Sequence, residues 1–344
     1  MSSKVKQAIV QFAGIALGAG LLYLAFKDTD LNQLVEALRT ANYSWLLVLV
    51  LALLLSNVLR AWRWTLFLNV LASGAGPTAP VPVKTAFYSV MIGYMVNNAV
   101  PRLGEVVRAG NLSRQASRPF SGVFATVFVE RVLDVIVLAF ILAGVVFLVA
   151  DEPAVRDLFL GSIEQQTSGI EWWHVALFVV VLALGAGVGL WLLQWLTKQT
   201  EGVLGKIGEL ARSFQDGLMT AVRSPYRIGI FTSTILMWGC YLIMVYVPFL
   251  MLDMVGPFDL SWGDAFIVLG IGTIGFMIPS PGGTGSYHYA VIQTLILLGV
   301  AEDPARTYAL LTHGSQFIVL TVAGFACLLA QGTKLSSALE TADG

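Results

Sequence analysis

The sequence predicts an all-α, polytopic integral membrane bundle, and three observations support this fold class. Hydrophobic residues make up 57% of the 344 residues and charged residues only 12%, whereas a soluble domain carries about 25% charged residues. The mean hydropathy is +0.78. The apolar residues also gather in runs of about 20, which is the length that a helix needs to cross a bilayer. This composition excludes a soluble enzyme, and no nucleic-acid partner is expected.

Six apolar segments are long enough to be full transmembrane helices. They are residues 7–26, 44–68, 121–150, 172–197, 226–251 and 307–330. The first has the position of a signal peptide, but no small-residue cleavage site follows it before "KDTD", so we expect an uncleaved helix. Trp62 and Trp64 lie near the end of the second run and suit an interfacial aromatic belt. Arg60 and Arg63 beside them are interpreted as interfacial anchors.

The distribution of charge predicts how these spans are oriented. If the N-terminus lies in the cytoplasm, the outer side receives most of the acidic residues and few basic ones. The basic residues on that side are Lys27, Arg39, Arg156 and Arg306. Because cytoplasmic loops carry the excess of Lys and Arg, both termini are expected in the cytoplasm and the protein in the inner or plasma membrane. Residues 198–224 are predicted to form a cytoplasmic amphipathic linker within one domain, 1–344.

Two further apolar regions are too short for single full spans. Residues 85–100 end at "PRLGE", and residues 265–278 end at "PSPGG" before another short run, 284–299. Each region fits either a short helix pair that enters the membrane and turns back or two thin spans. Both alternatives return the chain to the side from which it came, so the charge distribution does not separate them.

These two regions resemble each other in sequence. The pairs "AF" at 86 and "IG" at 92 recur at an offset of 179, and "PxxG" at 101 recurs at an offset of 178. Three long spans lie between the copies, so the second copy is expected to be inverted in the membrane. Inverted repeats with broken helices in corresponding positions are typical of secondary transporters. The alternative is chance similarity between apolar, glycine-rich segments.

The stretch "PSPGGTG" is predicted to be a break in the backbone at membrane depth. Such a break is tolerated only where protein or a watery cavity surrounds it. The helix that follows is expected to begin near Thr284, and its N-terminus would favour anionic groups. The residues assigned to the break are Pro279, Pro281, Gly282, Gly283 and Gly285. The alternative is a plain loop between two tilted spans.

Charged residues lie deep in the segment that begins near Ser121. Glu130, Arg131 and Asp134 stand about ten to fourteen residues into this helix, and charges at such depth cost at least ~2.5–3.5 kcal/mol each on insertion scales. Glu130 and Asp134 share one helix face, so an arginine from elsewhere, Arg102 or Arg108, is expected beside them. The cluster is interpreted either as a polar cavity for a headgroup or as a structural ion pair.

The stretch "NNAVPRLGEVVRAGNLSR" carries a second group of polar residues. Arg102, Glu105 and Arg108 recur every three residues and share a helix face. Glu105 can pair with one arginine and leave the other for phosphate recognition. Asn97 and Asn98 can cap the break or bind a ligand. The alternative is a juxtamembrane basic segment held at anionic lipids.

The cysteines and histidines predict no disulfide, metal site or cofactor. Cys240 and Cys327 both lie in apolar runs, which favours ordinary membrane packing. His174, His288 and His313 are far apart and lack metal-ligand spacing. His288 follows the glycine break and is expected to reach the cavity, whereas His313 is interpreted as a polar packing residue.

Three motifs in combination resemble the flippase-like family named after the membrane portion of lysylphosphatidylglycerol synthases, the multiple peptide resistance factors. They are "VPRLGEVVRAGNLSR", "ERVLDVIVL" and "PSPGGTGSYHYAVI". The resemblance covers roughly residues 10–330 and implies a helical bundle that moves lipids or lipid-linked headgroups between leaflets. It does not imply aminoacyl transfer, because the soluble synthase domain is absent from the sequence. His288 stands about where family members often carry a glutamate, and a neutral imidazole would not attract a cationic lipid as a carboxylate would.

We therefore predict a flippase or scramblase for a phospholipid or glycolipid, with no catalytic residue and no ATPase motif. The predicted substrate-binding residues are Asn97, Asn98, Arg102, Glu105, Arg108, Glu130, Arg131, Asp134, Pro279, Pro281, Gly282, Gly283, Gly285 and His288. Two alternatives stay open: a scaffold or regulator without transport, and a membrane-embedded enzyme on lipid phosphates. Glycine-rich spans such as "GIALGAG" also permit a homo-oligomer.

Overall fold

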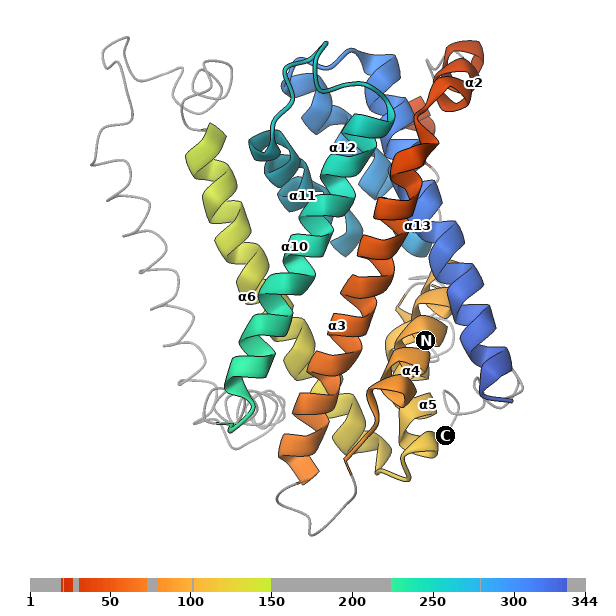
Figure 1. The fold of residues 1–344 in the computed structure, drawn as a ribbon, viewed down its shortest axis with the longest axis vertical. Coiled ribbons are helices and arrows are strands. Elements are labelled where there is room, and N and C mark those ends of the chain that lie inside the picture. The colour runs from red at the N-terminus through yellow and green to blue at the C-terminus, as the bar shows by residue number, and fades with distance from the viewer. Residues whose placement is uncertain are drawn as a thin grey trace, which may run out of the picture. The chain divides into compact units, whose positions relative to one another are not determined.

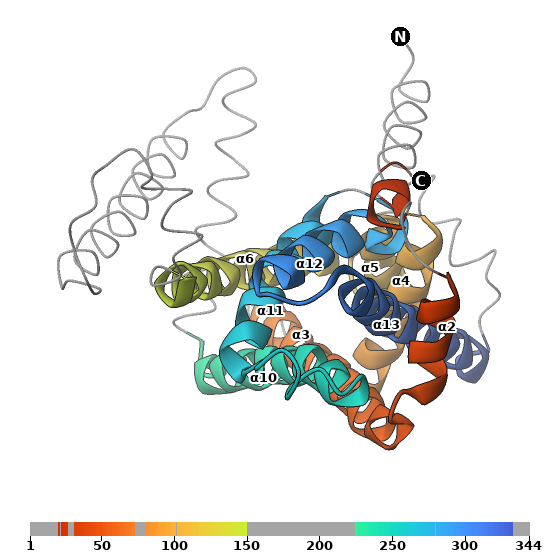
Figure 2. The same ribbon diagram turned by 90° about the horizontal axis from the view of Figure 1, so that it is seen from above.

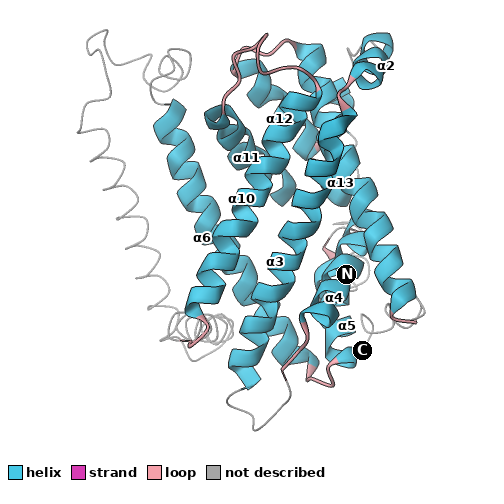
Figure 3. Ribbon diagram, in the orientation of Figure 1, coloured by secondary structure: helices cyan, strands magenta, loops and turns pink. Residues whose placement is uncertain are grey.

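The computed structural model describes residues 20, 22–26, 31–72, 80–100, 102–149, 224–278 and 280–332. Every regular element in these ranges is a helix (Figure 3). The chain divides into two compact units, of which the first comprises Met1–Glu130 and Ile228–Gly344 and the second Arg131–Arg227. The boundary at Glu130 falls inside one long helix, α6 (Phe120–Val149). Nearly all the described elements belong to the first unit.

Four helices in the described ranges are long and apolar enough to cross a membrane. They are α3 (Leu46–Ala72), α6, α10 (Arg227–Met251) and α13 (Glu302–Ala330). They coincide with the predicted spans at 44–68, 121–150, 226–251 and 307–330, so the prediction of a multi-pass helical membrane protein is confirmed. The predicted span at 172–197, the linker at 198–224 and most of the span at 7–26 lie outside the described residues.

Short elements precede the first of these long helices. The amphipathic helix α2 (Leu31–Thr40) packs against α13. A single 3₁₀ turn, η1 (Tyr43–Trp45), follows, and the side chain of Asn42 caps it by accepting the Ser44 N–H at 3.1 Å. The long helices do not all run in the same direction: in Figure 1, α3 and α13 run downward along the chain and α10 runs upward.

The first hairpin consists of two short helices, α4 (Val83–Ala99) and α5 (Leu103–Gln115), which lie side by side in the lower half of Figure 1. With 17 and 13 residues, both are shorter than a full span. Two glycines let them approach closely. A Cβ atom added at Gly104 would lie 2.0 Å from the carbonyl oxygen of Gly93.

The second hairpin consists of α11 (Trp262–Met277) and α12 (Ser286–Leu297), joined through the 3₁₀ turn η2 (Pro281–Gly283), and it lies in the upper half of Figure 1. Small residues again face the partner helix, because a Cβ atom at Gly275 would lie 3.0 Å from Cβ of Ala290. The two short predicted regions are therefore short helix pairs. Helix α12 begins at Ser286, two residues later than expected.

The first hairpin is enclosed by long helices. Helix α4 packs against α3, α5 and α13 (Figure 2). A Cβ atom at Gly324 on α13 would lie 2.6 Å from the carbonyl oxygen of Met91, so these two helices also touch closely. The buried core here includes Ala61, Trp64, Met91, Leu112 and Val127. The free cysteines Cys240 and Cys327 are both buried and form no disulfide with each other, as predicted.

Candidate functional site

The break between α4 and α5 is capped by a side chain from the end of α4. Asn97 Oδ1 accepts the backbone N–H of Gly104 at 2.7 Å, which confirms that an asparagine caps this break. Arg102, the residue before α5, has a left-handed backbone (φ 65°) and an exposed side chain. A non-glycine residue in this region is strained, and such strain is common at functional sites.

The break between α11 and α12 is built from glycines in left-handed conformations. Gly282, Gly283 and Gly285 have φ values of 57°, 78° and 92°. The hydroxyl oxygens of Ser280 and Ser286 lie 2.9 Å apart and tie the two ends of the break together. Pro281 begins η2, whereas Pro279 lies outside the described residues.

The two breaks meet inside the first unit. A Cβ atom at Gly282 would lie 3.6 Å from Cα of Asn98, so η2 rests on the end of α4. Asn98 Nδ2 also donates to the carbonyl oxygen of Phe317 at 3.2 Å and to Thr321 Oγ1 at 2.9 Å, both on α13. Asn98 therefore joins the first hairpin, the second break and α13.

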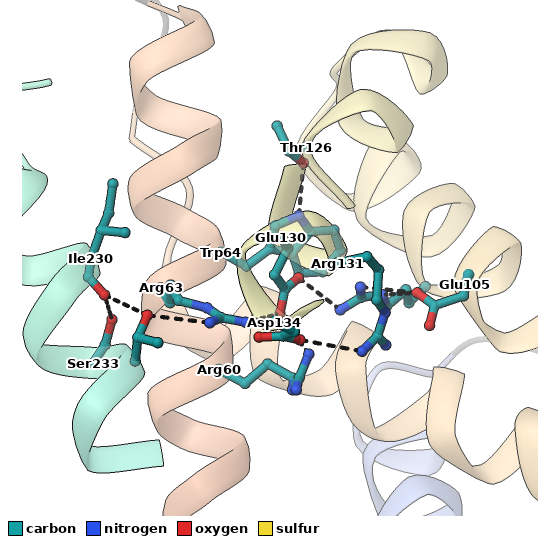
Figure 4. A network of polar contacts seen from close by, with 12 residues as sticks. Arg60, Arg63, Trp64, Glu105, Thr126, Glu130, Arg131, Asp134, Ile230 and Ser233 are labelled. Carbon is teal, nitrogen blue, oxygen red and sulfur yellow. Dashed lines mark hydrogen bonds and ion pairs between the residues drawn. The ribbon is translucent and has the colours of Figure 1, made fainter. Parts of the chain in front are cut away.

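A cluster of buried charges lies beside the first hairpin, and we call Arg60, Arg63, Arg108, Glu105 and Glu130 the charge cluster. Glu130 is completely buried, and its Oε1 lies 2.8 Å from Arg60 Nη1 and 3.1 Å from Arg63 Nη2 (Figure 4). Its Oε2 lies 3.1 Å from Arg108 Nη1. Arg108 Nη2 in turn lies 2.9 Å from Oε2 of Glu105, whose side chain is 24% exposed.

Neighbouring polar groups hold the arginines in place. Arg60 Nη2 donates to the Tyr241 hydroxyl at 2.9 Å, and Arg63 Nη1 donates to Thr234 Oγ1 at 3.2 Å, both on α10. The guanidinium carbon of Arg108 lies 5.0 Å from the ring centre of Trp64, which is within the range of a cation–π contact. The charge cluster and its partners therefore connect α3, α5, α6 and α10.

The interpretation of Arg60 and Arg63 as interfacial anchors is wrong. Both are buried in the charge cluster, and Trp64 donates its indole N–H to Thr126 Oγ1 at 2.8 Å instead of lying in an interfacial belt. The physical reason is the length of the helix. Helix α3 continues to Ala72, so these positions lie more than one helical turn inside the helix instead of at its end.

The expected arginine partner of Glu130 is Arg108 and not Arg102. Arg108 lies on the buried face of α5 and forms ion pairs with Glu105 and Glu130. The pair with Glu105 agrees with the prediction from their spacing of three residues. Arg102 stands at the strained end of α5. In the second unit, Arg131 Nη1 lies 3.4 Å from Asp134 Oδ2, one helical turn away on α6.

The second hairpin and α13 together form a cluster of aromatic and imidazole rings, which we call the ring cluster: Phe276, Tyr287, His288, His313 and Phe317. The rings of His288 and His313 have centroids 4.7 Å apart and are nearly perpendicular. His313 Nε2 lies 2.8 Å from the carbonyl oxygen of Gly282, so the imidazole donates to the unwound backbone of the break. His313 therefore does more than pack, and His288 lies in the first turn of α12, next to the break.

No group of three or more His, Cys, Asp or Glu side chains in the described ranges could hold a metal ion. The two imidazoles face aromatic rings and backbone, and the carboxylates of the charge cluster face arginines.

Residues 11–324 match the family model described as the lysylphosphatidylglycerol synthase TM region, which confirms the family resemblance of the sequence. A UPF0104 membrane protein of Pyrococcus horikoshii, PH1989, is 23% identical over 332 residues, which is 90% of this chain and 94% of that protein. Another, MJ1595 of Methanocaldococcus jannaschii, is 29% identical over 113 residues, which is only 32% of either chain. No solved structure matches this chain.

Proposed function

Because the chain belongs to the family of the lysylphosphatidylglycerol synthase transmembrane region, we propose that it is a lipid transporter, a flippase or scramblase. It moves the polar or charged headgroup of a phospholipid or glycolipid between leaflets, while the acyl chains stay in the bilayer. The movement is downhill or coupled to an ion gradient, and it involves no covalent step.

The observation that carries the proposal is the meeting of the two breaks. In a membrane, irregular backbone is tolerated only where it is buried in protein or lines a watery cavity. Here two such segments from distant parts of the sequence rest on each other at Asn98 and Gly282. The buried charge cluster lies beside one of them. A polar path through the apolar bundle needs both features, because a headgroup must find polar partners at every depth.

We further propose that both hairpins are re-entrant and form an inverted repeat. Both hairpins consist of helices too short for a full span, and they lie in opposite halves of the first unit (Figure 1). Their breaks meet at Asn98 and Gly282, and in the proposed arrangement this contact lies near the membrane midplane, as in secondary transporters. This arrangement would allow the path to open toward one side or the other by small movements of either hairpin.

The proposed orientation places both termini in the cytoplasm of a cell that carries the protein in its inner or plasma membrane. Lys84 at the start of α4 and Arg114 and Arg118 at the end of α5 gather where the first hairpin joins the long helices. Acidic residues, among them Asp253 and Glu302, flank the second hairpin. This distribution supports the orientation under the positive-inside rule, and labelling of single cysteines in intact cells tests it.

Reconstitution of the full chain into vesicles tests transport directly. Lipids with a fluorescent tag on an acyl chain and different headgroups are incorporated, and dithionite is added outside to quench the exposed tags. We expect tags from the inner leaflet to become accessible in a headgroup-dependent manner. A Gly283→Ala variant is expected to slow this loss of protection, because the new Cβ would lie 2.3 Å from Phe276 Cδ1 at a left-handed backbone position.

Gly239→Ala is the matched control, since a Cβ atom there meets nothing within 4 Å. If the wild type protects every lipid tested while it remains folded, the proposal fails and a scaffold or regulator without transport becomes the better account. If lipid phosphate is instead hydrolysed and His288→Ala abolishes the hydrolysis, the protein is an enzyme and the proposal is wrong.

A further inference from the structure

Two imidazoles hold the break of the second hairpin in place. His313 Nε2 lies 2.8 Å from the carbonyl oxygen of Gly282, and His288 Nδ1 accepts the backbone N–H of Gly285 at an N···N distance of 3.4 Å. A carbonyl oxygen only accepts, so His313 carries a proton on Nε2. A backbone N–H only donates, so His288 carries no proton on Nδ1. We call this conformation, in which both bonds are made, the closed break.

A further proton would affect the two imidazoles differently. An imidazolium donates from both of its ring nitrogens. His313 would keep its bond to Gly282 in that form, because Nε2 still carries a proton. On His288 the new proton would lie on Nδ1 and point at the N–H of Gly285, so that a donor would face a donor. The closed break therefore requires His288 to be neutral.

The groups that face His288 supply no counter-charge for an imidazolium. His288 lies in the first turn of α12, and this end of a helix dipole is positive. Its ring centroid lies 5.5 Å from that of Phe26 and 4.7 Å from that of His313 on α13. On α12 itself it lies 6.0 Å from the ring of Tyr287. Tyr287 and His313 are thus the titratable groups that face it, and neither is negatively charged at neutral pH.

The groups that face His313 supply no counter-charge either. Its ring centroid lies 5.5 Å from that of Tyr287 on α12 and 5.8 Å from that of Phe276 on α11. Tyr308, which precedes it on α13, donates its hydroxyl to the carbonyl oxygen of Val245 at 2.6 Å. In the part of the chain that the structure describes, neither imidazole forms an ion pair with a carboxylate.

Both imidazoles are shielded from solvent in the closed break. The exposed fraction is 2% for His288 and 6% for His313, so a proton from water reaches Nδ1 of His288 only when the break moves. Uptake of the proton and opening of the break are therefore linked. A ligand that binds one of two conformations shifts the equilibrium toward that conformation, so protons favour the open break.

We propose that His288 is a proton-binding site and that its protonation opens the break of the second hairpin, while His313 positions the break by holding Gly282. The inference rests on the proposed function in one respect: it makes the proton the ion to which lipid movement is coupled. In water the pKa of histidine is about 6.5. The open population should therefore rise as the pH falls below about 6.5, by up to about tenfold per pH unit for one proton.

Hydrogen exchange of the purified full-length protein tests the opening without requiring transport. Exchange is followed at the amides of residues 282–286 between about pH 5 and about pH 8 and is corrected for the intrinsic pH dependence of exchange. We expect protection of these amides to be constant at high pH and to fall by up to about tenfold per pH unit at low pH. The amides of α10 serve as the internal reference and should not respond. Protection at residues 282–286 that is independent of pH would overturn the proposal.

The His288→Gln variant distinguishes a titrating imidazole from a structural cap. Glutamine at this third position of a helix accepts the N–H of the capping residue, here Gly285, but does not titrate. We expect protection at high pH to be close to that of the wild type, and the fall at low pH to disappear. If this variant does not fold, His288→Asn also offers an amide oxygen, and the same result is expected. A pH dependence that survives in the folded variant would contradict the proposal.

Two further variants locate the proton within the ring cluster. Tyr287→Phe is the matched control, because it removes the other titratable group of α12 that faces His288, and its pH dependence should equal that of the wild type. His313→Gln keeps a donor for the Gly282 carbonyl and should also retain the pH dependence. If His313→Gln loses the pH dependence and His288→Gln retains it, the assignment of the proton to His288 is wrong.

The vesicle assay separates failure of this inference from failure of transport. Lipid movement is measured at low and high pH, with and without a pH gradient across the membrane, and we expect faster movement at low pH. Opening that depends on pH without movement of any lipid would keep the proton site and overturn the transporter. Lipid movement that responds neither to pH nor to a pH gradient would keep the transporter and overturn the proton as its coupling ion.

Discussion

The two hairpins have similar lengths and meet at their breaks, but they carry opposite chemistry. The first hairpin contributes Glu105 and Arg108 to a cluster of full charges. The second contributes His288 and the left-handed glycines of η2, and the groups around them are aromatic rings and hydroxyls. In the first hairpin, regular helices carry the charged side chains. In the second hairpin, the His313 imidazole and serine hydroxyls contact the irregular backbone and tie its ends together.

This difference follows from what each break leaves unsatisfied. The break of the first hairpin is short, and the Asn97 side chain satisfies the N–H of Gly104. The α5 helix can therefore carry long charged side chains in regular geometry. The break of the second hairpin is longer and leaves the carbonyl of Gly282 without a helical partner, and the His313 imidazole donates to it. The first hairpin thus carries charged side chains on regular helices, and the second carries the irregular backbone.

The largest effect is expected from removing the centre of the charge cluster. Glu130→Ala leaves three buried arginines without their shared carboxylate, and breaking a buried ion pair in this way costs about 3–5 kcal/mol. Thermal denaturation in detergent measures the loss. Glu302→Ala is the comparison, because its carboxylate is 62% exposed beside Arg306, and such surface pairs contribute at most about 1 kcal/mol. Equal losses of stability in the two variants would mean that the ion pairs of Glu130 contribute no more than a surface pair does.

The next effect comes from the contact within the first hairpin. Gly104→Ala places a Cβ atom 2.0 Å from the Gly93 oxygen and 2.6 Å from Asn97 Cγ, so the two helices must separate, at a cost of about 1–3 kcal/mol. Gly122→Ala on α6 meets nothing within 4 Å and should stabilise the helix by about 0.5–1 kcal/mol. Chemical denaturation of both variants should give opposite signs, and a common sign would contradict the close packing.

An effect of similar size distinguishes the two imidazoles of the ring cluster. His313→Leu removes the donor to the Gly282 carbonyl and leaves a buried acceptor unsatisfied, which costs about 1–3 kcal/mol. His288→Leu should cost less, because the hydrogen bond that His288 Nδ1 accepts from the Gly285 N–H is long, with an N···N distance of 3.4 Å. Hydrogen exchange of residues 280–286 should rise more in the His313 variant. The reverse order would show that His288, and not His313, holds the backbone of the break.

The smallest effect is expected where the hairpins meet. Asn98→Ala loses its two bonds to α13 and should lower stability by about 0.5–1.5 kcal/mol, with faster exchange at η2. Asn111→Ala loses bonds to Ser89 and Gln331, which lie away from the break, so it should cost a similar amount without affecting η2. If both variants speed exchange at η2 equally, Asn98 does not couple the two breaks.

Several features could be predicted from local sequence alone. Apolar runs of sufficient length locate the four described spans, and glycine and proline locate the two breaks within a residue or two. The spacing of Glu105 and Arg108 predicts their pairing, because residues three apart share a helix face. These properties depend on periodicity, composition and backbone stereochemistry, and each acts over a few residues.

The tertiary structure alone decided which charges meet. Arg60 and Arg63 lie about 70 residues from Glu130 along the chain, and beside two tryptophans they had the pattern of interfacial anchors. Only the packing of α3 against α6 and α5 shows that they face inward. The contact between Asn98 and Gly282 likewise cannot be predicted from the sequence of either segment alone. The sequence by itself determines where the chain is helical and broken, whereas long-range packing determines which polar groups are desolvated together, since the cost of burying a charge depends on the partners that the whole fold supplies.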